Sequence, residues 1–74
     1  MLNAYGSYQF PEDWVIRVDY DSSNNPIYVG AAPPNSSTSD AEWLIYKLTW
    51  TNGNMTLKQT ASGPWDSRTI LGYV

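Results

Sequence analysis

Carboxylates are the first candidates for chemistry in this sequence, because it contains no histidine and no cysteine. The absence of both residue types excludes Ser–His and Cys–His nucleophile–base pairs, thiolate metal sites and disulfides. Two carboxylate pairs remain, Glu12 with Asp13 and Asp40 with Glu42, and such a pair can hydrolyse glycosides. Acids this close in sequence more often serve turns and helix caps, so we expect no enzymatic activity and no catalytic residue.

A calcium loop is the second candidate, and it would begin at Asp19. Residues 19–25 read D-Y-D-S-S-N-N, which matches the opening of a D-x-D-x-S loop. The sixth position should be glycine and is Asn24, and the twelfth should be glutamate and is Gly30. Because Asp, Ser and Asn are also the residues that hairpin turns prefer, the segment predicts a plain turn, with no metal and no cofactor.

The charge pattern argues against nucleic acid and membrane partners. The net charge is −3 and the four basic residues are scattered, so no basic patch is available for phosphates. No apolar run approaches the ~20 residues of a membrane span, and residues 1–10 lack the cationic start and apolar core of a signal peptide. We expect the protein to be made in a cytoplasm and not to be exported by a standard route.

Size and composition point towards assembly with other proteins. A chain of 74 residues forms one domain at most, and a domain this small has a marginal core. Charged residues make up 15% of the chain, against ~25% in typical soluble domains. Aromatic residues also make up 15%, with four Trp and six Tyr, the types enriched in interface centres. These aromatics can fill a core, an interface or both, and a homo-oligomer is expected.

The N-terminal segment is predicted to differ from the rest of the chain. Residues 1–13 have little pattern and are interpreted as an arm or a loose first strand, while 14–74 form a single small β domain. The arm carries Tyr5, Tyr8 and Phe10. A solvated tail has no need of three aromatic side chains, so we expect these to dock on another surface.

Strand patterns follow along the chain. Residues 14–20 alternate and predict a half-buried strand, which pairs with 27–31 as a hairpin. Ser39 to Glu42 has the S-x-x-E pattern of a capping box, so a short helical turn is expected at 39–42 before a strand at 43–50. A last strand is expected at about 67–74. Together these segments predict an all-β fold with about five antiparallel strands, as a sandwich or a small open barrel.

The pair Asn52-Gly53 predicts a two-residue type I′ hairpin turn. With that turn, Trp50 faces Met55, Leu48 faces Leu57 and Lys47 faces Lys58. We expect the domain's own core to form from alternate residues on one face of this hairpin, which are Leu44, Tyr46, Leu48 and Trp50. The opposite face holds Trp43 and Ile45 beside two lysines that repel each other, so it is predicted to meet a partner. The alternative is that another strand of the same domain covers this face, with Asp19 as the carboxylate that meets the lysines.

Two stretches of the sequence resemble a pattern of small tailed-bacteriophage proteins. The run Y-V-G-A-A-P at 28–33, followed by T-S-D-A-E-W-L-I-Y-K-L-T-W at 38–50, is similar to Y-[IV]-G-x-A-x-P-G and T-S-x-A-x-W-x-I-x-K-L-T-[YW] in that family. The W-D-x-R at 65–68 resembles its W-[DE]-x-R. The similarity covers about 14–74. Asn35 stands where the family has glycine, and the turn should survive because Asn tolerates a left-handed backbone.

The resemblance implies a virion structural protein without catalysis or cofactor, made in the host cytoplasm. It would bridge or decorate the neck, tail or capsid through contacts with other virion proteins. The alternative is a receptor- or glycan-binding module of a tail or fibre, with Trp43, Trp65 and Tyr46 as stacking platforms. The candidate partner interface comprises Tyr5, Tyr8, Phe10, Trp43, Ile45, Lys47, Lys58 and Trp65.

Overall fold

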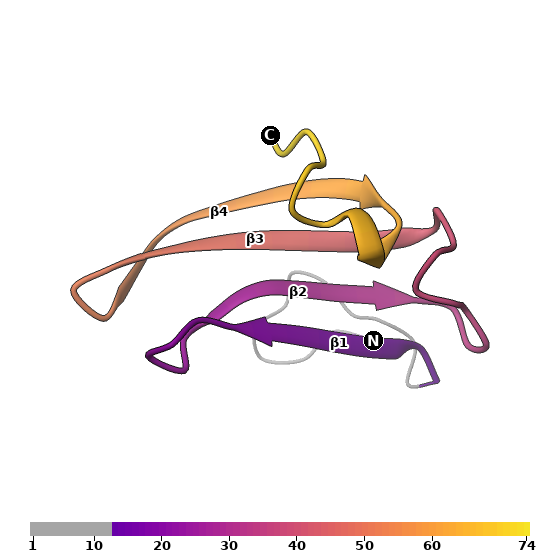
Figure 1. Cartoon of the computed structure of the whole chain (residues 1–74), viewed down its shortest axis with the longest axis horizontal. Helices are drawn as coiled ribbons and strands as arrows, with labels where there is room; N and C mark the ends of the chain where they lie inside the picture. The colour runs from indigo at the N-terminus through magenta and orange to yellow at the C-terminus, as the bar shows by residue number, and fades with distance from the viewer. Residues whose placement is uncertain (1–12) are drawn as a thin grey trace, which may run out of the picture.

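The computed structural model describes residues 13–74, which form one antiparallel sheet with the strand order β1-β2-β3-β4 (Figure 1). The all-β prediction is confirmed, with four strands in place of five. Among the described residues the strands form a single sheet, with neither a second sheet nor closure into a barrel. The strands are β1 (Val15–Tyr20), β2 (Pro26–Ala32), β3 (Trp43–Thr51) and β4 (Asn54–Gly63).

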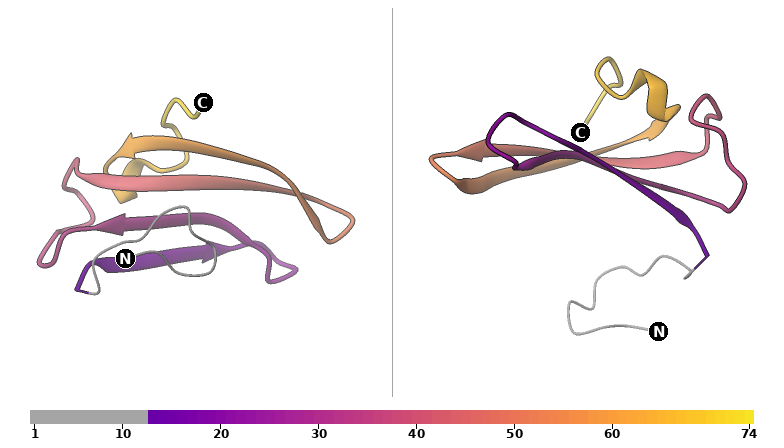
Figure 2. Two further views of the ribbon diagram at one scale, coloured as in Figure 1. Left: turned by 180° about the vertical axis from the view of Figure 1, so that it is seen from behind. Right: turned by 60° about the horizontal axis from the view of Figure 1, so that its bottom comes forward.

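The C-terminal segment is not the strand that the sequence predicts. It begins with a 3-10 helix, η1 (Trp65–Ser67), and continues as turns and coil. Figure 2 (right) shows this segment lying over one side of the sheet. Only Val74 pairs with the sheet, where its N–H and C=O each bond Thr60 of β4 at 3.1 Å. The prediction of a strand at 67–74 is therefore wrong beyond this one residue, because Leu71 and Tyr73 pack against the buried cluster of the sheet.

The turn between β1 and β2 is held by the carboxylate of Asp21. Its Oδ1 accepts hydrogen bonds from the backbone N–H groups of Ser23 at 2.8 Å and Asn25 at 3.0 Å. Asn24 adopts the left-handed conformation with φ 65°, which Asn tolerates well. The predicted turn is present, and Asp21 uses its carboxylate to close it.

The loop between β2 and β3 contains turns but no helix. Asn35 has φ 68°, so it adopts the expected left-handed turn. The N–H of Ser37 donates to Asp40 Oδ2 at 2.8 Å, and the N–H of Asp40 donates to the Ser37 carbonyl at 3.0 Å. This reciprocal turn replaces the helical turn predicted at 39–42, because a strand of aromatic and branched residues follows at once. The strand predicted at 43–50 is confirmed and extends by one residue.

The β3–β4 hairpin has the predicted turn and a register that changes part-way along. Asn52 and Gly53 both have positive φ, at 52° and 82°, and Trp50 faces Met55 as predicted. Thr49 then faces Leu57, so Thr56 is the extra residue of a β-bulge. Its hydroxyl donates to the Thr49 carbonyl at 3.3 Å.

The predicted register is wrong by one residue beyond this bulge. Leu48 faces Lys58 and Lys47 faces Gln59, so the two lysines lie on opposite sides of the sheet. The repulsion between directly opposed lysines, which the uninterrupted register would impose, is removed. The bulge thus relieves the one unfavourable pair in the predicted hairpin.

The strand register separates the sheet into an inner and an outer face. The inner face lies under the C-terminal segment, and the buried hydrophobic cluster forms there from Ala32, Trp43, Ile45 and Trp65. The prediction that Leu44, Tyr46, Leu48 and Trp50 build the core is wrong, because they point to the outer face. The inner face also carries Val15, Arg17, Asp19, Tyr28, Gly30, Lys47, Thr49, Leu57, Gln59 and Ala61.

Candidate functional site

Trp65 attaches the C-terminal segment to the inner face by packing over Gly30. A Cβ at Gly30 would lie 2.7 Å from two ring carbons of Trp65 and 3.2 Å from the ring of Trp43. The two indole rings are 5.8 Å apart between centroids and tilted by 43°, within the range of favourable aromatic pairs. Glycine at this central position of β2 therefore creates the space that Trp65 fills.

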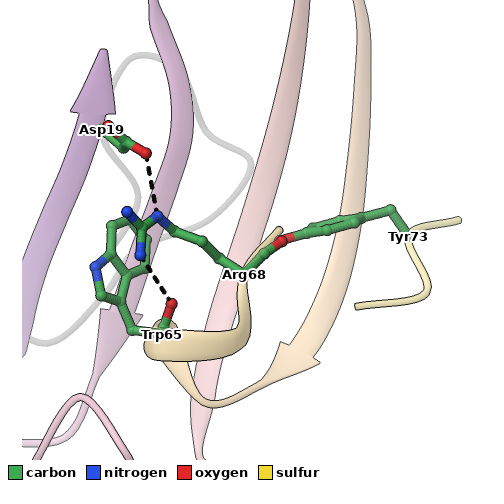
Figure 3. A network of polar contacts seen from close by, with 4 residues as sticks. All are labelled: Asp19, Trp65, Arg68 and Tyr73. Carbon is green, nitrogen blue, oxygen red and sulfur yellow. Dashed lines mark hydrogen bonds and ion pairs between the residues drawn. The ribbon is translucent and has the colours of Figure 1, made fainter. Parts of the chain in front are cut away.

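Arg68 joins the same segment to β1 (Figure 3). Its Nε forms an ion pair with Asp19 Oδ2 at 3.1 Å, and its Nη1 donates to the Trp65 carbonyl at 3.2 Å. The guanidinium also lies 4.7 Å from the centre of the Trp65 ring, a cation–π distance. One side chain thus links the first strand, the 3-10 helix and the buried indole.

Tyr73 completes the cover further along the chain. Its hydroxyl donates to the Arg68 carbonyl at 2.8 Å, and its ring lies 6.0 Å from the ring of Tyr28. Burial, followed by repulsion from a Tyr28 phenolate, raises the pKa of Tyr73 to about 12. The neutral phenol is therefore the form that the fold accommodates. Lys47 also lies over this ring, with Nζ 5.7 Å from its centre.

The carboxylates do not form a reactive centre in the part of the chain that the structure describes. Asp40 serves the Ser37 turn, Asp21 serves the β1–β2 turn, and Glu42 is exposed. Residues 13–74 contain no group of three potential His, Cys, Asp or Glu metal ligands close together. They also contain no buried charged residue whose desolvation could activate it.

The predicted interface residues do not form one surface. Trp43 and Ile45 are fully buried and Trp65 is 6% exposed, so these three have little surface left for a partner. Lys47 lies on the inner face, whereas Lys58 lies on the outer face, 5.0 Å from the ring centre of Tyr46. Tyr5, Tyr8 and Phe10 lie outside the described residues.

The outer face is the candidate interaction site. Its exposed apolar side chains include Ile16 at 49%, Val18 at 39% and Met55 at 50%. Between strands β1 and β3, Ala31 is buried beside its cross-strand neighbours Ile16 and Leu44. Within residues 13–74, no segment lies over this face, because the C-terminal cover occupies the other side (Figure 2). The outer face comprises Ile16, Val18, Val29, Ala31, Leu44, Tyr46, Leu48, Trp50, Met55, Lys58, Thr60 and Ser62.

A notch lies where the β3–β4 hairpin extends past the end of β2. Its volume is about 300 Å³, at the lower limit for small-molecule sites. Trp50 forms a fixed wall, because its Nε1 donates to the Pro26 carbonyl at 2.6 Å. The charged groups at the notch are already engaged, Asp21 in the turn and Lys47 against Tyr73. The lining residues are Asp21, Ile27, Tyr28, Lys47, Leu48, Thr49 and Trp50.

Comparison of the chain with models of protein families, with curated proteins and with solved structures finds no match. No helix within residues 13–74 is long and apolar enough to cross a membrane. The outer face is the most extensive apolar surface on the sheet.

Sequence reasoning missed both Arg68 as a link and the outer face as the exposed surface. Gly30 in the middle of a strand could have indicated a large side chain packed close above it. The run Trp65-Asp66-Ser67-Arg68 could then have supplied that side chain. Nothing local distinguishes the two faces of β3, since both carry large apolar residues.

Proposed function

We propose that this protein is a structural subunit of a tailed-phage virion that acts through protein–protein contacts at the neck, tail or capsid. The observation that carries the proposal is the apolar outer face, whose side chains at Ile16 and Met55 remain about half exposed. Contiguous apolar surface of this kind marks contact sites on otherwise polar proteins. The resemblance of residues 28–33 and 38–50 to a pattern of small tailed-phage proteins is the reason for proposing a phage virion as the assembly.

The covered inner face supports the same proposal. The chain gains its own hydrophobic cluster on one side of the sheet only, so the sheet has a second face to offer. Repetition of a small subunit around a particle stabilises its fold by mass action. A structural role of this kind depends on contacts over the whole outer face and requires no reactive side chain.

The glycan-binding alternative loses two of its three stacking platforms, because Trp43 and Trp65 are in the core. Tyr46 is the one that remains on the outer face, and Lys58 lies over its ring. No observation in the described residues favours that function over assembly.

The test is the protein composition of purified particles of the phage whose genome encodes this chain. We expect the chain to co-purify with intact virions at a fixed ratio to the major capsid protein. A variant with Ile16→Lys on the outer face should be depleted from particles. Leu57→Lys, at a side chain that is also 49% exposed but on the inner face, should be retained. Absence of the wild-type chain from washed particles overturns the proposal.

A further inference from the structure

Charged residues are distributed over the two faces of this sheet in the reverse of the usual way, with more on the covered face than on the uncovered one. The four strands contain four charged residues, Arg17, Asp19, Lys47 and Lys58. Three of them lie on the inner face, where Asp19 and Lys47 contact the C-terminal segment and Arg17 is exposed, and only Lys58 lies on the outer face. An antiparallel sheet that faces water on one side normally presents its polar residues there. This outer face therefore has the composition of a surface that becomes buried.

Both edges of the sheet are protected against pairing with another chain. The edge of β4 carries the Thr56 bulge and Lys58, and Val74 occupies the backbone groups of Thr60. The edge strand β1 is six residues long, holds Arg17 and Asp19, and is irregular at Tyr20. Bulges, charges and short edge strands are the devices that prevent edge-to-edge addition. Association is therefore directed to the face of the sheet.

We propose that the outer face binds the outer face of a second copy of this chain, so that two sheets pack into an eight-stranded sandwich. The proposal deepens the proposed function, and it rests on that function for the need to assemble. Two sheets packed face to face are a stable two-layer architecture with aligned strands. Each copy supplies the layer that the other one lacks among its described residues.

The size of the face suits a dimer. Strands about 4.8 Å apart with a rise of ~3.3 Å per residue give a four-stranded sheet of ordinary strand length a face of roughly 19 by 23 Å. Two such faces in contact bury on the order of 900 Å² when treated as flat. Because protruding side chains have more surface than a plane, the buried accessible area rises towards the ~1,200 Å² at which stable interfaces begin. The single charge, on Lys58, lies on the outermost strand of the sheet and so at the rim. Rim charges cost little at an interface.

The experiment is sedimentation equilibrium of the full 74-residue chain over a range of concentrations. Wild-type protein should show a species of twice the 8.3 kDa chain mass. Ile16→Lys should raise the dimer dissociation constant at least tenfold while the circular dichroism spectrum stays that of a folded β protein. The matched control, Leu57→Lys, starts from the same exposure on the other face and should leave the dissociation constant within about twofold.

Several outcomes separate this proposal from the proposed function. Equal weakening of the dimer by Ile16→Lys and Leu57→Lys overturns the face-to-face arrangement. A wild-type chain that is monomeric at every concentration overturns the dimer, whether or not Ile16→Lys then lowers its melting temperature. If that monomer is still found in virions, the assembly function stands and only the second copy is excluded as the occupant of the outer face.

Discussion

The inner and outer faces of this one sheet are built by different rules. On the inner face, charged and aromatic residues are combined into contacts with the C-terminal segment, through Arg68 to Asp19 and through Tyr73 to Lys47. The outer face is nearly all apolar and keeps side chains such as Ile16 about half exposed. Polarity therefore does not indicate which face is covered here, because the charged and aromatic side chains of the inner face contact one another.

The difference between the two faces indicates which contacts stabilise the isolated fold. A segment of ten residues after Pro64 lies over the inner face, and its Trp65 ring packs against the buried Trp43 ring of β3. The outer face contributes little until something covers it, since apolar surface stabilises a fold only when removed from water. Substitutions on the two faces should therefore differ in size and in kind.

Truncation of the central indole should give the largest effect. Trp43→Ala removes a fully buried side chain and should lower the free energy of unfolding by about 3–5 kcal/mol. Val18→Ala on the outer face should lower it by less than ~1 kcal/mol. Both are measured by urea denaturation at low protein concentration. Equal losses from the two variants would show that the faces are not distinct.

Filling the space above Gly30 should give the next largest effect. Gly30→Ala places a Cβ 2.7 Å from the ring of Trp65, so the ring has to move, at a cost of about 1–3 kcal/mol. Gly72→Ala is the matched control, because a Cβ there meets nothing within 4 Å. Thermal unfolding monitored by Trp fluorescence compares the two. A neutral Gly30→Ala would contradict the close packing of Trp65 on β2.

Replacement of Arg68 by lysine should give a smaller loss of about 1 kcal/mol. Lysine keeps the positive charge near Asp19 but cannot also bond the Trp65 carbonyl in the same geometry or lie flat on the indole. Asp19→Asn tests the ion pair alone and should cost less. The difference between the two variants should persist in high salt, because only the ion pair is screened.

The smallest effect is a pH dependence from Tyr73. Its pKa is about 12 in the folded chain, against 10.0 for an ordinary tyrosine. The unfolded chain therefore loses this proton first, so the contribution of Tyr73 to stability is present below pH 10 and is lost as the pH rises from 10 towards 12. Denaturation midpoints across this range measure the slope, and Tyr73→Phe should make it shallower. An unchanged slope in that variant would assign the dependence to other tyrosines.

The elements that the sequence predicted well are those that local chemistry specifies. Asn52-Gly53 selects its turn because both positions need positive φ, and Asp21 closes its turn through its own carboxylate. The alternation in residues 14–20 and 43–50 likewise places β1 and β3 within one residue of their ends. Each of these features is decided by neighbours within a few positions.

The features that could not be predicted from the sequence depend on contacts between distant segments. The Thr56 bulge reverses the facing of every later residue in β4, and no turn residue marks it. Trp65 reaches Gly30 across 35 positions, so only the folded chain shows that the tail is a cover and not a strand. The choice of core face follows from that cover, which is why the candidate site moved to the opposite face.

The bulge at Thr56 also has a consequence for changes in chain length. If Thr56 is deleted, Met55 still faces Trp50 and Leu57 still faces Thr49, now in an uninterrupted ladder. Every side chain further along β4 keeps its face, whereas a one-residue deletion in a regular strand inverts all that follow. Deletion of the Thr56 codon therefore removes one residue from the middle of a strand and leaves the later side chains on the same faces of the sheet.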